Sequence, residues 1–408
     1  MVKGTMEALL KTAQGPGNVE LGRVPIPKVV PEQVLIRVHA CGICGSDLKI
    51  EIDEHPYVPP VVMGHEFAGE IVEVGRDVDG WAVGERVVAE QHTHACGHCR
   101  QCLTGNAFAC ASKRAPGYMV DGGFAEFIKI PAWLLHRIPD NLSYVDAALS
   151  EPAAVAAHGV LDRTGIEPED VVLVLGCGPI GLLAAKMAQA AGAARVIVTG
   201  IDRDEQVRLP RARELGIDHT LNVMKMDLAT LVSDLTGGEG ADVVIELSGA
   251  PPAIAQAFQL ARRLGRVGII GQPPSDDVSI PYRDALFRAL TVSFSYSSRY
   301  TSWERALSLF ERGALEPAKF ITHILPLGEW KRGFELARSG QAIKVVLEPL
   351  GCGRNKSFHP RSRRIPGDYT HSGPGLQSRP SWMGKQISKG ACHEYPKNHE
   401  GCCIGGLW

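Results

Sequence analysis

A single stretch constrains the fold of this chain more than any other. Residues 171–189 read VVLVLGCGPIGLLAAKMAQ, which is an apolar strand, a glycine-rich turn and a helical run in that order. The turn has the pattern G-x-G-x-x-G, whose glycines allow a tight turn and a close approach of the backbone to a ligand. The N–H groups that open the helix can then bind a pyrophosphate. The stretch therefore predicts a dinucleotide-binding unit, with contacts from Gly176, Gly178, Pro179, Ile180 and Gly181.

The pattern of the chain changes along its length. Residues 1–150 hold short β-type runs broken by Gly and Pro, which are typical of a small barrel or sandwich. From about residue 152 strands alternate with helical stretches, so we expect a doubly wound parallel sheet with helices on both faces. A helix–helix–strand segment, 301–349, could return to the first domain. Residues 351–408, with nine Lys or Arg against three Asp or Glu, are expected to be a disordered tail or an unrelated extension.

Charge and hydropathy exclude several classes of partner. The formal net charge of -2 offers no general attraction for nucleic acid or an anionic membrane. No apolar run reaches the roughly 18 residues of a membrane-spanning helix. The opening MVKGTMEALL lacks the order of a signal peptide, so we expect a cytoplasmic protein. In that compartment clustered cysteines are expected to be metal ligands or redox groups rather than disulfides.

Four cysteines follow one another closely in the pattern C-x2-C-x2-C-x7-C. Thiolates are soft donors that suit Zn²⁺, and four of them complete a tetrahedral structural site. An iron–sulfur cluster is the competing interpretation, because closely spaced cysteines bind both. Since the sulfurs complete a ligand set, the neighbouring His92, His94 and His98 are expected to be surface residues. The four are Cys96, Cys99, Cys102 and Cys110.

A second metal site is indicated by residues that lie further apart. The segments CGICGSD, GHE and EPAAVAAH supply Cys44, His65 and a carboxylate from Glu66 or Glu151. A catalytic zinc needs about three protein ligands of mixed type and one position open for water or substrate. These residues meet that need, and the sequence leaves open which glutamate binds the metal directly.

Together these motifs resemble those of the zinc-containing medium-chain dehydrogenases/reductases, closest to the sorbitol (L-iditol 2-) dehydrogenase and threonine dehydrogenase branches. The resemblance covers roughly residues 6–349. It implies an α/β protein in which a mainly β GroES-like catalytic domain accompanies a Rossmann domain with a doubly wound parallel sheet. The expected limits are 1–155 and 300–349 for the catalytic domain, 156–299 for the NAD(P)-binding domain and 350–408 for the tail.

The resemblance also implies roles for individual residues. Cys44, His65 and Glu66 match the catalytic-zinc segment of the family. Asp47 matches a carboxylate that orients the zinc-binding histidine, in keeping with the usual support of metal ligands by hydrogen bonds. Ser46 matches a hydroxyl that can take the proton of the alcohol.

The choice of cofactor depends on the end of the second strand of the parallel sheet, where an acidic residue normally binds the ribose of NAD. The expected place falls at Gly200, and Asp202 comes two residues later. Arg203 could meet the 2′-phosphate of NADP, but Asp202 and Asp204 beside it would repel that group. The sequence favours NAD and leaves NADP open.

The implied reaction is hydride transfer between a small-molecule alcohol and nicotinamide, with one catalytic and one structural zinc in each chain. Glu151, which matches an acidic position of the polyol enzymes, favours a polyol or other secondary alcohol. Arg299 resembles in part a substrate contact of sorbitol dehydrogenases. L-Threonine 3-dehydrogenase is the alternative activity, and a nicotinamide-binding regulatory protein is the non-enzymatic alternative. By resemblance, a homo-oligomer (dimer or tetramer) is expected.

Overall fold

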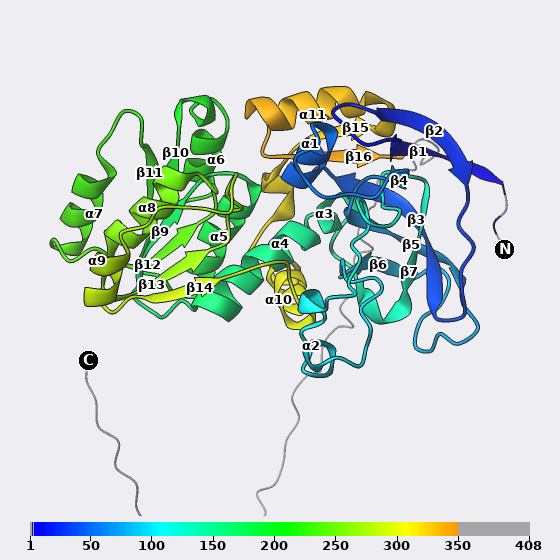
Figure 1. The fold of residues 1–408 in the computed structure, drawn as a ribbon, viewed down its shortest axis with the longest axis horizontal. Helices are drawn as coiled ribbons and strands as arrows, with labels where there is room; N and C mark the ends of the chain where they lie inside the picture. Colours follow the sequence, from blue (N-terminus) through cyan, green and yellow to red (C-terminus); the bar gives the residue numbers. More distant parts are fainter. Residues whose placement is uncertain (1, 3, 350–408) are drawn as a thin grey trace, which may run out of the picture. The chain divides into compact units, whose positions relative to one another are not determined.

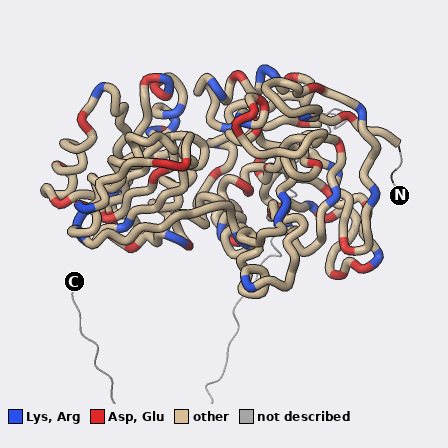
Figure 2. The backbone as a smooth tube through the Cα atoms, in the orientation of Figure 1, with Lys and Arg blue, Asp and Glu red and all other residues tan. Residues whose placement is uncertain are grey.

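The computed structural model describes residue 2 and residues 4–349. The expectations for the tail, 350–408, lie outside these described residues. The strands form one parallel sheet and two sheets that are mainly antiparallel (Figure 1). Acidic and basic residues are interspersed along the chain (Figure 2). Among the described residues, no helix is both long and apolar enough to cross a membrane.

The parallel sheet confirms the doubly wound arrangement expected from the alternating pattern. Its strand order is β11-β10-β9-β12-β13-β14, and every neighbouring pair is parallel. The order reverses between β9 and β12, and ligands of such sheets bind in the crevice at that reversal, beyond the carboxyl ends of the strands. The strands are β9 (Val171–Leu175), β10 (Arg195–Gly200), β11 (His219–Asn222), β12 (Ala241–Glu246), β13 (Ala261–Ile269) and β14 (Thr291–Phe294).

Both faces of this sheet are covered, which explains why its central strand β9, with the sequence VVLVL, is apolar throughout. Side chains alternate along β9, so Val172 and Val174 pack in the core that includes α5. Leu173 and Leu175 point the other way and pack in the core that includes α8. The helices are α5 (Pro179–Ala190), α6 (Arg208–Glu214), α7 (Leu228–Thr236), α8 (Pro251–Leu260) and α9 (Tyr282–Phe287), with a 3₁₀ turn, η4 (Asp202–Asp204).

The mainly antiparallel sheets combine the N-terminal part of the chain with its last described strands. The larger sheet has the order β15-β16-β3-β5-β6-β8, with β7 also paired to β3, and the smaller has the order β2-β1-β4. Residues Val346 and Leu347 of β16 pair with Gly42 and Cys41 of β3. The domain limits themselves remain a prediction. The strands are β1 (Thr5–Lys11), β2 (Val19–Pro25), β3 (Gln33–Gly42), β4 (Val61–Val62), β5 (Glu66–Val74), β6 (Arg86–Ala89), β7 (Phe127–Pro131), β8 (Leu135–Arg137), β15 (Ile321–Pro326) and β16 (Lys344–Glu348).

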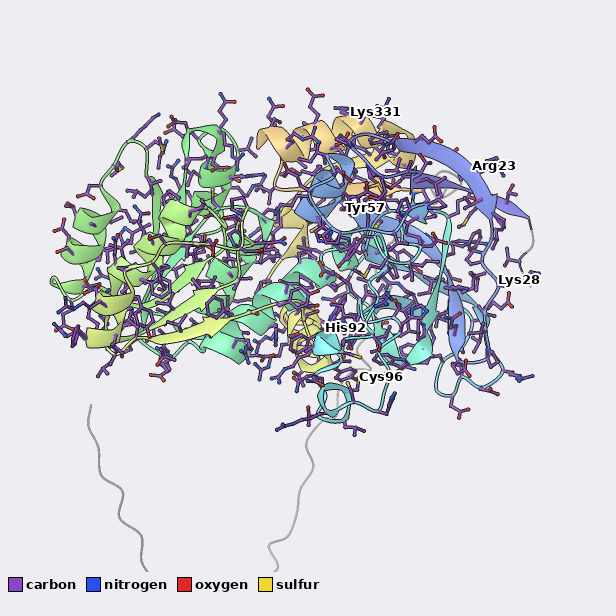
Figure 3. All side chains as sticks on the ribbon, in the orientation of Figure 1. Arg23, Lys28, Tyr57, His92, Cys96 and Lys331 are labelled. Carbon is purple, nitrogen blue, oxygen red and sulfur yellow. The ribbon has the colours of Figure 1, made fainter. Side chains whose placement is uncertain are left out.

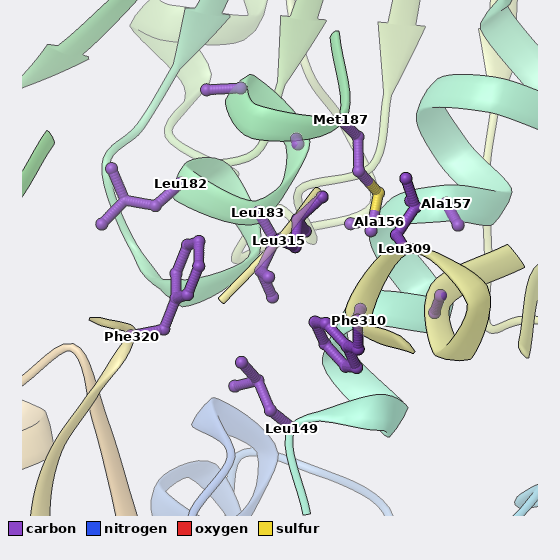
Figure 4. Close-up of a cluster of buried hydrophobic side chains, with 14 of the residues drawn as sticks. Leu149, Ala156, Ala157, Leu182, Leu183, Met187, Leu309, Phe310, Leu315 and Phe320 are labelled. Atoms are coloured by element: carbon purple, nitrogen blue, oxygen red, sulfur yellow. The ribbon is translucent and has the colours of Figure 1, made fainter. Parts of the chain in front are cut away.

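Helix α4 (Ser150–Ala157) packs against α5 and against α10 (Tyr300–Glu311). Every residue of α4 except Val155 is buried, and its alanines allow the neighbouring helices to approach closely. Figure 4 shows Ala156 and Ala157 beside Met187 of α5 and Leu309 of α10. The remaining helices are α1 (Gly45–Glu51), α2 (Arg100–Leu103), α3 (Tyr144–Ala147), α11 (Trp330–Ser339), the π-helix η3 (His158–Thr164) and the 3₁₀ turns η1 (Ala107–Ala109), η2 (Ala132–Leu134), η5 (Pro317–Lys319) and η6 (Leu327–Glu329).

Candidate active site

Three side chains of the predicted catalytic set converge at one end of the antiparallel sheet. A sulfur of Cys44, a ring nitrogen of His65 and a carboxylate oxygen of Glu66 all lie within 4.8 Å of one another. The register of the sheet produces this convergence, because Gly42 near the cysteine pairs with Glu66 at the start of β5. A side chain at position 42 would collide with the Glu66 carboxylate and displace it, so glycine there keeps the carboxylate in this position. Thiolate, imidazole and carboxylate together form a donor set that suits Zn²⁺.

Two further predicted residues of the α1 segment border this set. The Asp47 carboxylate is fully buried, and one of its oxygens accepts a hydrogen bond of 2.9 Å from the Cys44 N–H. Its other oxygen lies 3.8 Å from Nδ1 of His65. The hydroxyl oxygen of Ser46 lies 3.4 Å from Nε2 of the same ring. Each ring nitrogen of His65 therefore has a polar side chain nearby that can help to orient the imidazole.

A buried lysine that sequence reasoning missed supports Glu66. Nζ of Lys344, on β16, donates to both Glu66 carboxylate oxygens at 2.6 and 2.8 Å and to the Ile43 carbonyl at 2.9 Å. Lys344 is 3% exposed. Burial alone would lower the pKa of Lys344, but the charges of Glu66, Cys44 and Glu151 and the hydrogen bond to Glu66 together outweigh it, and the pKa is raised. The one sequence signal was a lysine at the start of the apolar run KVVLE.

The second candidate glutamate is held differently. Glu151 lies in the first turn of α4, and its carboxylate accepts a hydrogen bond from the Gln91 amide. Burial, together with the charge of Glu66, raises the pKa of Glu151 to about 8. Within the described residues, the group of mutually close ligand atoms contains Glu66 and not Glu151.

Sequence reasoning also missed Lys113, Tyr118 and Tyr296. Tyr118 packs edge-on against the His65 ring, with ring centroids 5.7 Å apart. Nζ of Lys113 donates to the Tyr296 hydroxyl at 3.4 Å and to the Ser297 hydroxyl at 3.3 Å. Burial lowers the pKa of Lys113 to about 8, and the nearby Glu151 charge opposes that shift. No motif marked these residues, because they follow the last cysteine and β14 in irregular segments.

The four cysteines form a separate group in a short lobe. The sulfurs of Cys96, Cys99, Cys102 and Cys110 lie within 4.8 Å of one another. The N–H of Cys96 donates to the Cys110 sulfur at 3.4 Å, and that of Cys99 donates to the Cys96 sulfur at 3.3 Å. Such N–H donors stabilise thiolates, and the one from Cys96 contributes most to lowering the pKa of Cys110 to about 6.

The sulfur spacing favours a single metal ion over a cluster. A tetrahedral zinc with bonds of about 2.3 Å holds its sulfurs roughly 3.8 Å apart. The sulfurs of Cys96 and Cys110 are 3.7 Å apart. An iron–sulfur cluster, with several iron atoms between its ligands, would hold the sulfurs further from one another.

One expectation for the histidines near this lobe is wrong. His94 and His98 are exposed, but His92 is fully buried. Its Nε2 lies 2.8 Å from the Ser298 carbonyl and 3.3 Å from a Glu90 oxygen, and the same carboxylate lies 3.2 Å from Nε2 of His136. Figure 3 labels His92 and Cys96 where the chain passes from the sheet into the lobe. His92 is buried because its segment packs on the loop before α10, a contact that spacing alone cannot reveal.

The predicted dinucleotide loop joins β9 to α5. Gly176 has φ of +114°, and a side chain at Gly181 would collide with the Gly176 carbonyl, so both positions require glycine. Gly178 caps α5, Pro179 occupies its first turn, and Ile180 follows. The free N–H groups at this helix start suit a pyrophosphate.

The residues at and after the end of β10 lie where the ribose of the cofactor is expected to bind. A side chain at Gly200 would come within 2.7 Å of the buried Cys177 sulfur, which leaves no room there for a carboxylate. Asp202 and Arg203 are exposed in η4, and Asp202 accepts a hydrogen bond of 2.8 Å from the Asn222 amide.

Arg299 is engaged in an ion pair at the start of α10. Its Nε donates to the Asp162 carboxylate at 3.0 Å, and Arg305 also binds that carboxylate. Its contact with substrate remains a prediction.

The chain is similar to known dehydrogenases over most of its length. Residues 30–140 match the family model described as alcohol dehydrogenase GroES-like domain, and residues 179–312 match the one described as zinc-binding dehydrogenase. A sorbitol dehydrogenase of Halalkalibacterium halodurans is 38% identical, over 85% of this chain and 100% of the relative. An L-threonine 3-dehydrogenase of Bacillus licheniformis is 41% identical, over 85% and 99%. A zinc-binding dehydrogenase of Sinorhizobium meliloti, solved with NADP, superposes with a TM-score of 0.78 at 35% identity, over 85% and 100%.

Proposed function

The chain belongs to the zinc-dependent alcohol dehydrogenase family, and on that basis we propose that Cys44, His65 and Glu66 bind a catalytic zinc at which a polyol or other secondary alcohol is oxidised. The protein is an NAD(P)-dependent oxidoreductase that acts on CH–OH groups of small molecules and uses zinc. The convergence of three chemically mixed donors within 4.8 Å carries the proposal for the site.

Residues around the three proposed ligands would handle the proton, orient the imidazole and neutralise the buried carboxylate. Zinc held here supplies a Lewis acid that eases loss of the alcohol proton, while nicotinamide accepts the hydride. Ser46, whose hydroxyl lies 3.4 Å from Nε2 of His65, would take up the alcohol proton, and the Asp47 carboxylate, 3.8 Å from Nδ1, would favour one orientation of the imidazole. Lys344 neutralises the buried Glu66 carboxylate and fixes its position.

The cofactor and the second metal have their own candidate residues. The N–H groups at the start of α5, after Gly176 and Gly178, would hold the pyrophosphate, with Asp202 and Arg203 on the ribose side. The four-cysteine lobe would hold a structural zinc, because its thiolates leave no position open for substrate.

To identify the substrate, zinc-replete protein is incubated with polyols and simple secondary alcohols in the presence of NAD or NADP. Turnover is followed by the absorbance of the reduced nicotinamide. We expect turnover of at least one secondary alcohol. Absence of turnover with every alcohol and both cofactors would overturn the proposed activity. L-Threonine belongs in the same panel, because a relative 41% identical carries the name L-threonine 3-dehydrogenase. We further propose that the protein is cytoplasmic and forms a dimer or tetramer. A measurement of its molar mass in solution tests the number of subunits.

A further inference from the structure

Lys113 is a cation without an anionic partner close to the proposed zinc site. Its side chain is partly buried, and its Nζ donates to the hydroxyls of Tyr296 and Ser297 at 3.4 and 3.3 Å. Nζ also lies 4.7 Å from the centre of the Tyr296 ring. Among the described residues, no carboxylate forms an ion pair with this lysine.

The neighbours of Lys113 connect it to the proposed zinc ligands. Glu151 is near enough for its charge to act on Lys113. The Tyr118 ring packs edge-on against His65. Burial raises the pKa of Tyr118, and the nearby Tyr296, Glu151 and Cys44 raise it further. Lys113 is therefore linked through Tyr296 and Glu151 to the surroundings of the proposed zinc ligands.

The hydrogen bonds of Lys113 leave its charge unbalanced. An ammonium has three donors, and here two of them point to neutral hydroxyl oxygens at 3.4 and 3.3 Å, slightly beyond the usual N–H···O distance. Partial removal of a cation from water costs free energy unless an anion compensates for it. A carboxylate or phosphate that arrives with the substrate would accept the third donor in a charge-assisted bond.

We propose that Lys113 binds an anionic group, carboxylate or phosphate, carried by the alcohol substrate, with Tyr296 and Ser297 holding the ammonium in place. The inference rests on the proposed function and narrows its substrate class from polyols in general to alcohols that bear an anion. If the anion is a carboxylate, the substrate is a hydroxy acid, which includes hydroxy amino acids. If it is a phosphate, the substrate is a phosphorylated polyol.

Matched substrates test the inference. Each pair compares a neutral alcohol with an anionic one: 2,3-butanediol with L-threonine and 3-hydroxybutyrate, and sorbitol with sorbitol 6-phosphate. In Lys113→Gln we expect KM for the anionic member that the enzyme uses to rise about tenfold or more, with a smaller change in kcat, because a hydrogen bond to a charged group is lost. Lys113→Arg should restore KM to within about threefold. The pair in which the effect appears identifies the anion.

The matched control is Arg114→Gln. Arg114 is the adjacent cation, is exposed, and donates to the backbone carbonyls of Ser112 and Lys113. It should leave KM for every substrate within about twofold. Equal effects of Lys113→Gln on neutral and anionic members would overturn the inference, as would unchanged KM for all anionic substrates.

Calorimetric titration of the zinc-loaded protein with the same anionic compounds, without cofactor, separates this inference from the activity itself. Weaker binding by Lys113→Gln than by Arg114→Gln supports the anion site even if no alcohol is oxidised. Turnover of neutral polyols with anion binding unaffected by Lys113→Gln refutes the anion site and leaves the proposed activity standing.

Discussion

The two metal-ligand groups of this protein are built in opposite ways. The four cysteines come from one short stretch, Cys96 to Cys110, whose turns are held by N–H···S hydrogen bonds and a single-turn helix. The catalytic group joins Cys44 to His65 and Glu66 at the ends of paired strands, with Lys344 added from the far end of the described chain. On the proposed assignment, the first group would depend on its zinc for local order, whereas the second is positioned by the pairing of β3 with β5.

Loss of a catalytic ligand should give the largest effect. In Cys44→Ala we expect kcat/KM to fall about a thousandfold or more, since several kcal/mol of metal-derived stabilisation are lost. Zinc content, measured by atomic absorption, should fall by about one ion per chain, with little change in thermal midpoint. Cys41→Ala is the control, because Cys41 is a buried cysteine outside the ligand group. Full zinc content and activity in Cys44→Ala would break the comparison.

Removal of the buried cation should destabilise the catalytic end of the sheet. Lys344→Met leaves the Glu66 carboxylate buried without its partner, so the free energy of unfolding should fall by about 3 kcal/mol or more in denaturant titrations. The double variant Lys344→Met/Glu66→Gln, which removes both charges, should recover part of that loss. No recovery would mean that packing, and not charge, dominates at Lys344.

A change next to the metal ligands should have an intermediate effect. Asp47→Asn keeps the shape of the side chain but removes the charge that faces His65. Zinc affinity at the catalytic site should fall about 10- to 100-fold, measured by competition with a chelator. The lobe zinc is an internal control in the same protein and should be released at the wild-type chelator concentration.

Loss of a lobe ligand should affect order more than chemistry. In Cys99→Ser we expect loss of the lobe zinc and rapid proteolysis between residues 96 and 110, because metal binding and local folding are coupled. The activity that remains should lie within about tenfold of wild type, since four-cysteine zinc sites have no open position for substrate. A thousandfold loss of activity in a protein that keeps its catalytic zinc would contradict the separation of the two sites.

The smallest effect concerns the segment that leads into the lobe, where Glu90 faces His92 and His136. Burial alone would raise the pKa of Glu90, but the hydrogen bonds from His136 and His92 and the charges of these two residues together outweigh it, and the pKa is lowered. Glu90 therefore stabilises the fold above its unfolded pKa of about 4.3, and this stability is lost as pH falls through the lower folded value.

The measurement is the free energy of unfolding of Glu90→Gln as a function of pH. The variant should be about 2 kcal/mol less stable at neutral pH, and the difference should shrink below about pH 4. Glu304→Gln, which removes the half-exposed partner on the other side of His136, should cost less. If the difference in free energy of unfolding between wild type and Glu90→Gln grew toward acid pH, it would contradict a lowered pKa of Glu90.

Features that depend on residues close together in the sequence could be predicted, whereas several features that depend on contacts between distant residues were missed. The strand, turn and helix around Gly176 and the four-cysteine pattern were read from local spacing, and the structure contains both arrangements. The expected surface position of His92 was wrong, because its burial comes from a contact with Ser298, more than two hundred residues away. Lys113 and Lys344 carried no motif at all.

The sequence by itself determined the fold class and indicated two candidate groups of metal ligands, because glycine turns and closely spaced thiolates act over a few residues. It left open which glutamate joins Cys44 and His65. Only the tertiary structure brought Glu66 into that group, through the pairing of β3 with β5, and supplied Lys344 through the pairing of β16 with β3. A buried carboxylate needs a partner, and strand pairing over the length of the chain, not local spacing, decides where that partner comes from.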